Sequence, residues 1–260
     1  MAAALAHVGR RLLGAAVFVA VLGIWEVWAR NEASFLVPPA SSVVEAAWDV
    51  WPTTAFLTEV AASLKRLAAG YMLGAGIGIA VGLLMGSSRS ARRTFEPLVE
   101  LARATPVIAI VPVAIVILGL GDAMQVAVIA FGVCFSVLVN TVEGVRAVSP
   151  EVRDTASMLH VGGVERVFRI YLPAALPSIA AGLRIAISLG LVLVVISEFA
   201  GEGGGLGHYI LDQQGQFNVP AMYAGILFLG LLGYALNRMF LIVERRVLAW
   251  HSGATGETAR

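Results

Sequence analysis

The sequence has few charged residues and few of the side chains on which chemistry usually depends. Only 13% of its 260 residues are charged, and it contains one cysteine, Cys134, and one lysine, Lys65. A single cysteine excludes a disulfide within the chain, so we interpret it as a small core residue. The four histidines stand at positions 7, 160, 208 and 251. Their wide separation does not predict a metal site.

A nucleotide-binding motif is also missing. A P-loop requires Gly-Lys-Ser or Gly-Lys-Thr because the lysine neutralises phosphates, but Leu64 precedes the only lysine. The glycine cluster GEGGGLGHY at 201–209 is therefore no P-loop, and it follows no strand as a dinucleotide motif would. We interpret it as a flexible outer loop. With no Gly-x-Ser-x-Gly or His-Glu-x-x-His motif either, the sequence predicts no enzyme activity.

Apolar residues dominate what remains. They make up 58% of the chain, the mean hydropathy is +0.85, and the net charge is only +1. This composition predicts an all-α integral membrane protein that does not bind nucleic acid. Six stretches have about the length that a bilayer requires. They are Leu12–Ala29, Leu64–Met85, Leu98–Leu118, Met124–Val142, Ile179–Phe199 and Ala221–Val243.

The arginines predict cytoplasmic termini. Six spans place both termini on one side, and cytoplasmic loops are enriched in basic residues. With the N-terminus inside, the outer segments hold only Arg30. The inner segments hold Arg10, Arg11, Arg89, Arg92, Arg93, Arg146, Arg153, Arg166, Arg169, Arg245, Arg246 and Arg260.

Three regions follow from this topology. Residues 1–60 comprise the first span and an extracytoplasmic segment with a short amphipathic helix, Val43–Val50, and residues 61–245 form the transmembrane core. Residues 246–260 form a cytoplasmic tail. The tryptophans at 25, 28, 48 and 51 are typical of an interfacial belt.

Glycines recur every fourth residue in the second span, at Gly70, Gly74, Gly78, Gly82 and Gly86. Small residues at this spacing let a neighbouring helix backbone come close. The row rotates by about 40° per step on a straight helix. It therefore predicts either a right-handed crossing or two successive partners.

Polar residues and prolines inside the spans are candidates for the transport path or a gate, because buried charge is costly in a membrane. They are Arg103, Pro106, Asn140, Arg184 and Glu198. Two simpler interpretations compete: Arg103 extends to the cytoplasmic surface, and Arg184 makes a structural pair. Pro112 predicts a kink in the third span.

The most polar long segment is Ser149–Pro173. Its pattern predicts two short amphipathic helices, the first capped by Ser149 and the second ended by Pro173. Val152, Ala156 and Leu159 share one face of the first. The second has its apolar face at Val164, Val167, Phe168, Tyr171 and Leu172. Spacing alone leaves open whether the segment docks a partner or is an ordinary connector.

The run DTASMLHVGGVERVFRIYLPAALP at 154–177 resembles the EAA loop of bacterial ABC importer permeases. Asp154, Thr155 and Ala156 match Glu-Ala-Ala, and Leu172 and Pro173 match Leu-Pro, whereas His160 replaces the usual glycine. If the bend is kept, Gly162 and Gly163 could supply it. Further stretches, including SLKRLAAGYMLGAGIGIAVGLLMGSSR and AGLRIAISLGLVLVVISEFAG, resemble the sulfonate, taurine, nitrate and thiamine-precursor branch.

The resemblance implies a type I ABC importer permease with a MetI-like fold in the bacterial inner membrane. It implies two copies of an ATPase subunit that bind ATP and Mg²⁺, so this chain binds no cofactor itself. It also implies a second permease copy, in a homodimer, and an extracytoplasmic solute-binding protein. The ATPase-coupling residues would be Asp154, Thr155, Ala156, Met158, Leu159, His160, Val161, Gly162, Gly163, Phe168, Leu172 and Pro173. The binding-protein-facing residues would be Gly201, Gly205, Gly207 and Tyr209.

Two other classes compete with the importer permease. A secondary transporter would place coupling acids inside its spans, where only Glu198 qualifies, and would usually show an internal repeat. A membrane scaffold or intramembrane enzyme is the third possibility, and the enzyme would need a nucleophile constellation that the sequence lacks.

Overall fold

The computed structural model describes residues 2–32 and 35–249, with side chains from residue 16 onward. All regular elements in these ranges are helices, as predicted. The chain forms two compact units. The first contains Met1–Glu59 and Tyr209–Leu229, and the second contains Val60–His208 and Gly230–Arg260.

The first unit begins with α1 (Ala2–Glu32) and α2 (Ala40–Val50). The latter confirms the predicted amphipathic helix and buries Val43 and Ala47. Two of the four tryptophans of the expected belt pack inside the unit. Trp25 lies beside Tyr223, and the Trp51 indole donates a hydrogen bond to the Ala224 carbonyl. Only Trp28 and Trp48 of the four are largely exposed.

The glycine row of α3 (Thr54–Ser87) packs against a single helix, α6 (Asp122–Arg146). A Cβ on Gly70, Gly78, Gly82 or Gly86 would lie 2.6 Å from Ile129, Cys134, Thr141 or Val145. A Cβ on Gly74 would collide with the Ala130 carbonyl. Two successive partners are therefore ruled out for these five glycines. Contacts advance by about four residues on both helices, as in packing of i±4 ridges.

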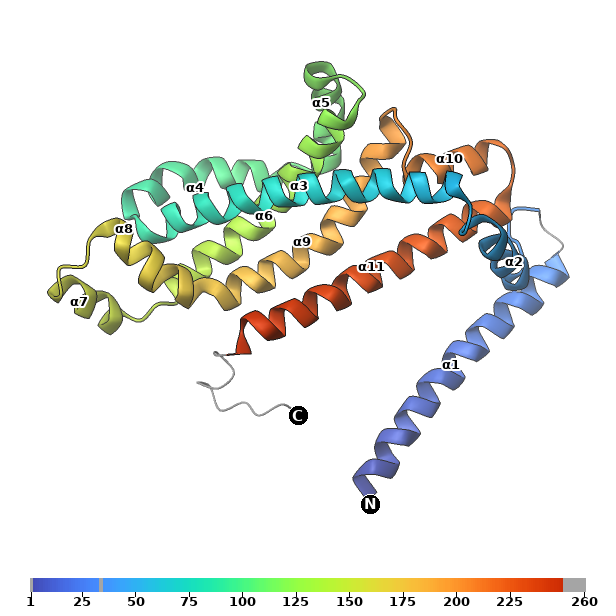
Figure 1. Ribbon diagram of the computed structural model, residues 1–260, viewed down its shortest axis with the longest axis horizontal. Helices are drawn as coiled ribbons and strands as arrows, with labels where there is room; N and C mark the ends of the chain where they lie inside the picture. Colours follow the sequence, from blue (N-terminus) through green and yellow to red (C-terminus); the bar gives the residue numbers. More distant parts are fainter. Residues whose placement is uncertain (1, 33–34, 250–260) are drawn as a thin grey trace. The chain divides into compact units, whose positions relative to one another are not determined.

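The core of the second unit lies between α6 and α9 (Leu172–Ala200). The two helices run antiparallel, since Gly132 meets Leu193, Gly182 meets Asn140, and Gly144 meets Ala175. Met124, Val128, Ile129, Val133 and Val137 of α6 are almost completely buried. Figure 1 shows α9 lying along α6.

The predicted third span is broken, not merely kinked at Pro112. It consists of α4 (Arg89–Ala104), a 3₁₀ turn η1 (Val107–Ile110) and α5 (Val111–Leu118), with a bend of 93°. The break lies at Thr105–Pro106, because proline lacks an N–H and holds the preceding residue in extended conformation. Pro112 is tolerated in the first turn of α5. The break is visible between α4 and α5 (Figure 1).

Four helical segments in the described part are long and apolar enough to cross a membrane. They are Thr54–Ser87, Asp122–Arg146, Gly163–Ala200 and Val219–Val247 (α11), and the bent pair makes a fifth if it counts as one span. The first predicted span falls within α1, whose early side chains lie outside the described residues. Most of the predicted tail, from residue 250 on, also lies outside them.

Candidate functional site

The coupling segment, Ser149–Pro173, is the stretch predicted to contact the ATPase. Its first helix begins where expected, but its second helix does not end where expected. Ser149 occupies the N-cap position of α7 (Pro150–Met158), with proline in its first turn. The second helix starts as α8 (Gly163–Arg166) and continues through a π-helical turn, η2 (Val167–Tyr171), directly into α9. Pro173 does not end it, because proline is accommodated in the first turn of α9. The segment is therefore continuous with a membrane-spanning helix.

The bend between α7 and α8 lies at His160. This residue has φ of +50°, the left-handed conformation that glycine adopts most easily. Gly162 instead has φ of −60° and precedes α8 as its N-cap residue. The expectation that Gly162 and Gly163 supply the bend is wrong, since the residue with left-handed backbone conformation at the bend is His160.

The segment exposes a row of apolar side chains. Met158, Leu159, Val164 and Phe168 are between 62% and 78% exposed. Val167, Tyr171 and Leu172 turn inward and contribute to a core cluster, so the predicted second face is divided. The π turn contributes to this division because it contains an extra residue. Beside the exposed row lies a groove of about 270 Å³, with Val152, Leu159 and Ile170 on its walls and the buried Ala156 at its floor.

Arg153 anchors α7, a role that its place in the sequence did not suggest. Its guanidinium donates hydrogen bonds to the carbonyls of Val145, at 2.8 Å, and Arg146, at 3.2 Å. It also lies over the ring of Tyr171, 5.8 Å from the centroid. The arginine thereby joins α7 to α6 and η2. The only sequence signal for this role is that a basic residue lies one turn into a helix that begins with proline.

The polar groups near the α7 start are exposed. Asp154 and Thr155 face solvent, and the Thr155 hydroxyl donates to the Glu151 carbonyl. The Glu151 N–H and the Ser149 hydroxyl hold the pKa of the Glu151 carboxyl below its ordinary value. The carboxylate at this end is therefore kept charged, which suits a helix N-terminus.

Two candidate path residues line one pocket, of about 300 Å³, beside the break between α4 and η1. Arg103 and Asn140 contribute polar groups, and Phe131, Phe135 and Val139 contribute apolar walls. The Asn140 amide nitrogen donates to the Ser136 carbonyl. Arg103 is exposed and makes no ion pair or hydrogen bond within the described residues.

The other three candidates lie elsewhere. Pro106 forms the break next to the pocket, and Arg184 is exposed on α9 without an ion-pair partner in the described ranges. Arg184 thus does not make the structural pair that was considered. Glu198 is completely buried near the end of α9.

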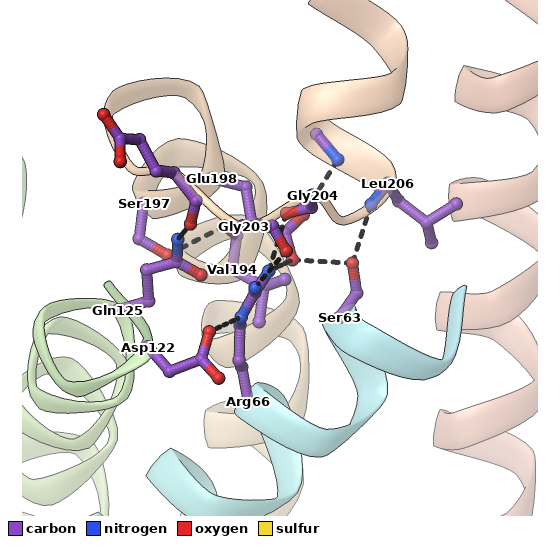
Figure 2. A network of polar contacts seen from close by, with 12 residues as sticks. Ser63, Arg66, Asp122, Gln125, Val194, Ser197, Glu198, Gly203, Gly204 and Leu206 are labelled. Atoms are coloured by element: carbon purple, nitrogen blue, oxygen red, sulfur yellow. Dashed lines mark hydrogen bonds and ion pairs between the residues drawn. The ribbon is translucent and has the colours of Figure 1, made fainter. Parts of the chain in front are cut away.

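Glu198 belongs to a polar network that sequence reasoning missed (Figure 2). Its carboxylate accepts from the Ser63 hydroxyl at 2.7 Å, the Gly207 N–H at 2.8 Å and the Arg66 guanidinium at 3.2 Å. Arg66 also pairs with Asp122 at 2.7 Å. A charged glutamate buried in a membrane is stabilised by a cationic partner. That preference was the signal pointing to Arg66, which follows the only lysine.

The same network holds the glycine cluster, so the expectation of a free, flexible loop is wrong. Arg66 donates to the carbonyls of Gly203 and Gly204, both at 2.7 Å, and the Leu206 N–H donates to Ser63. Residues 203–205 all have φ between +76° and +116°, which only glycine adopts easily. A Cβ on Gly205 would also collide with the Glu198 carboxylate.

The residues expected to face a binding protein differ in how exposed they are. Gly205 and Gly207 are buried, and Gly201 is half-buried, whereas Glu202 and Gly203 are exposed. Tyr209, in α10 (Leu206–Gly215), packs edge to face on Phe56 within the first unit, and burial raises the pKa of its hydroxyl. The surface of the loop is therefore formed by Glu202 and Gly203.

Comparison with known proteins places this geometry among transport proteins. Residues 74–249 match the family described as binding-protein-dependent transport system inner membrane component. A probable ABC transporter permease of Brucella abortus is 31% identical over 98% of this chain and all of its own length. A putative aliphatic sulfonates transport permease of Bacillus subtilis is 29% identical over 75% of this chain and 70% of its own. A bicarbonate transport permease of Synechococcus elongatus is 30% identical over 91% and 89%.

Solved structures show the same fold. The methionine ABC transporter in inward-facing conformations aligns with a TM-score of 0.63 and 19% identity, over 74% of this chain and 95% of that one. A bacterial alginate ABC transporter, solved with an alginate-bound periplasmic protein, aligns with a TM-score of 0.64 and 14% identity, over 93% and 96%.

Proposed function

We propose that this chain, which belongs to the family of binding-protein-dependent transport system inner membrane components, carries a small anion past Arg103. It is the permease subunit of an ABC importer in the inner membrane, and it is a transport subunit, not an enzyme. The open question is its solute. The observation that carries the proposal is the unpaired guanidinium in the pocket beside the helix break.

The pocket has the chemistry that a small anion with an apolar part would need. Arg103 supplies a planar fork of donors that matches a carboxylate or sulfonate, and the Asn140 side chain adds a polar group. Phe131 and Phe135 supply an apolar wall. The relatives named for aliphatic sulfonates and bicarbonate transport anions, which supports this class of solute.

A thiamine-precursor-like solute is the second candidate. Phe131 and Phe135 pack edge to face, with ring centroids 4.8 Å apart, and both line the pocket. Such a pair can accept a flat heteroaromatic ring. Arg103 would contribute little to the binding of such a neutral ring, so a charge-removing substitution separates the two candidates.

We further propose that ATP drives transport through Ser149–Pro173. A separate ATPase, in two copies that bind ATP and Mg²⁺, would dock on the exposed Leu159 and Phe168. Because η2 continues into α9, movement of the docked segment would rotate a spanning helix and expose the pocket alternately to each side. A second copy of the permease would complete the path, and an extracytoplasmic binding protein would deliver the solute.

The solute is tested by replacing the charge at Arg103. We expect Arg103→Gln to lower uptake of an aliphatic sulfonate by about tenfold or more in proteoliposomes containing the whole transporter. Arg103→Lys should retain part of the uptake, and Arg245→Gln, a matched change in the last turn of α11, should retain all of it. Unchanged sulfonate uptake by Arg103→Gln would exclude this arginine from the path.

The docking surface is tested separately by co-purification. We expect Leu159→Glu or Phe168→Glu to leave the permease in the membrane at normal levels but to abolish recovery of the ATPase, because each puts a charge in an apolar contact. Val44→Glu, at a 60% exposed site on α2, is the control. Full ATPase recovery with both coupling variants would remove these residues from the interface. Since Ala156 is buried, Ala156→Asp should also destabilise α7.

A further inference from the structure

Five arginines line one pocket at the cytoplasmic ends of the helices. Arg89, Arg92 and Arg93 come from α4, Arg146 from the end of α6, and Arg153 from α7. The pocket has a volume of about 480 Å³, and its other lining residues are Met85, Gly86 and Ser87. No acidic residue of the described chain lines it, although Glu96 lies 3.6 Å from the Nε of Arg92. The pocket therefore carries a strong positive charge.

Helix dipoles account for one of these arginines but not for the three on α4. Arg146 lies in the last turn of α6, where a cation is favourable. Arg89, Arg92 and Arg93 lie at the start of α4, the positive end of its dipole, and no acidic residue occupies that first turn. Each costs stability there unless an anion offsets the charge. These three arginines therefore destabilise the start of α4 when the pocket holds no anion.

Two of the guanidiniums also have donor capacity that the chain does not use. The Nε atoms of Arg92 and Arg153 are buried and have no hydrogen-bond partner among the described residues. The terminal nitrogen of Arg153 already bonds two backbone carbonyls, so its orientation is set by the protein. An unpaired buried donor destabilises the folded protein. The described part of the chain therefore leaves both guanidiniums incompletely hydrogen-bonded.

We propose that this arginine pocket binds a phosphate group, supplied by an anionic phospholipid headgroup or by soluble phosphate. Arginine matches phosphate oxygens in bidentate geometry. Basic pockets between membrane helices on the cytoplasmic side are suited to phospholipid headgroups. Because Arg153 belongs to α7, a bound phosphate would link α4 to the coupling segment. The membrane surface would then influence how firmly the coupling segment is held.

The test uses the full-length chain purified in detergent, with native mass spectrometry and the melting temperature as readouts. The probes are phosphatidylglycerol, phosphatidylcholine and inorganic phosphate. The test variant is Arg89→Gln with Arg93→Gln, both exposed and without a contact to the backbone. The matched control is Arg245→Gln with Arg246→Gln, which removes the same charge from the end of α11.

We expect the wild type to bind phosphatidylglycerol more strongly than phosphatidylcholine, and the test variant to lose about tenfold in that affinity while the control keeps it. Arg89→Lys with Arg93→Lys should recover part of the binding. If instead inorganic phosphate raises the melting temperature of the wild type but not of the test variant, and both lipids bind alike, the phosphate is soluble. Equal binding of every probe by the wild type and the test variant would overturn the proposal, as would an equal loss in the control.

Discussion

One arginine at the outer end of the membrane helices and five at the inner end differ in which groups neutralise their charge. At the outer end, the Arg66 side chain is 5% exposed, and Asp122, Glu198 and two glycine carbonyls accept its hydrogen bonds. At the inner end, five arginines surround a pocket, and within the described part of the chain only Arg92 has a carboxylate within 4 Å. The outer charge is neutralised inside the protein and stabilises a loop. The inner charge is largely left unneutralised by the described residues, which is the basis of the proposed phosphate site.

The largest expected effect comes from breaking the outer network at Glu198. Glu198→Ala leaves Arg66 buried without its one buried carboxylate partner among the described residues, so we expect a loss of about 3 kcal/mol in the free energy of unfolding. Thermal unfolding in one detergent, followed by tryptophan fluorescence, measures it. The control is Asp122→Asn, whose side chain is 73% exposed, with an expected loss under about 1 kcal/mol. Equal losses would mean that burial does not distinguish the two partners.

A smaller effect is expected from matched glycine substitutions at the two ends. Gly205→Ala forces a side chain onto a residue with φ of +116° and toward the Glu198 carboxylate, so we expect a loss of about 2 kcal/mol. Gly163→Ala at the inner end meets nothing within 4 Å and should change stability by less than about 0.5 kcal/mol. The same melting experiment compares them. A tolerated Gly205→Ala would show that the outer loop readily adopts another conformation.

The smallest effect is a gain, at the bend of the coupling segment. His160→Gly should stabilise the protein by up to about 1 kcal/mol, because glycine adopts φ of +50° without the steric cost that histidine bears. His160→Val should be destabilising, since branched side chains avoid this conformation. Melting temperatures of the three proteins test the order. If glycine gives no gain, histidine contributes an interaction that compensates for its backbone conformation.

Sequence reasoning succeeded where a feature depends on local pattern. Among the described residues, apolar length identified four of the six predicted spans, and the four-residue glycine spacing identified a helix-packing surface on α3. It failed where the outcome depends on long-range contacts. Arg66 and Glu198 are 132 residues apart, so their pairing could not be read from spacing. Pro106 and Pro112 lie six residues apart in one apolar run, and only the surrounding packing determines which one breaks the helix.

Some residues of the candidate sites could be predicted from the sequence because their position depends on local pattern alone. The exposed Leu159 and Phe168 follow from amphipathic periodicity, whereas the burial of Ala156 and the continuity of η2 with α9 depend on tertiary packing. The arginines of the inner pocket were all assigned correctly to one side by charge bias. Their convergence required the fold, because α4, α6 and α7 contribute them from separate parts of the chain.

The glycine row of α3 also limits how the protein can move. Each of the five glycines sits against one site on α6, and these sites recur about every four residues. Sliding α3 along α6 by less than one such step would push side chains into backbone, and a full step of about 6 Å would break all five contacts before four of them could form again. The two helices should therefore move as one rigid body. During transport, α3 and α6 should therefore tilt together. Changes in the protein's conformation would then occur at the break at Pro106 and at the bend at His160.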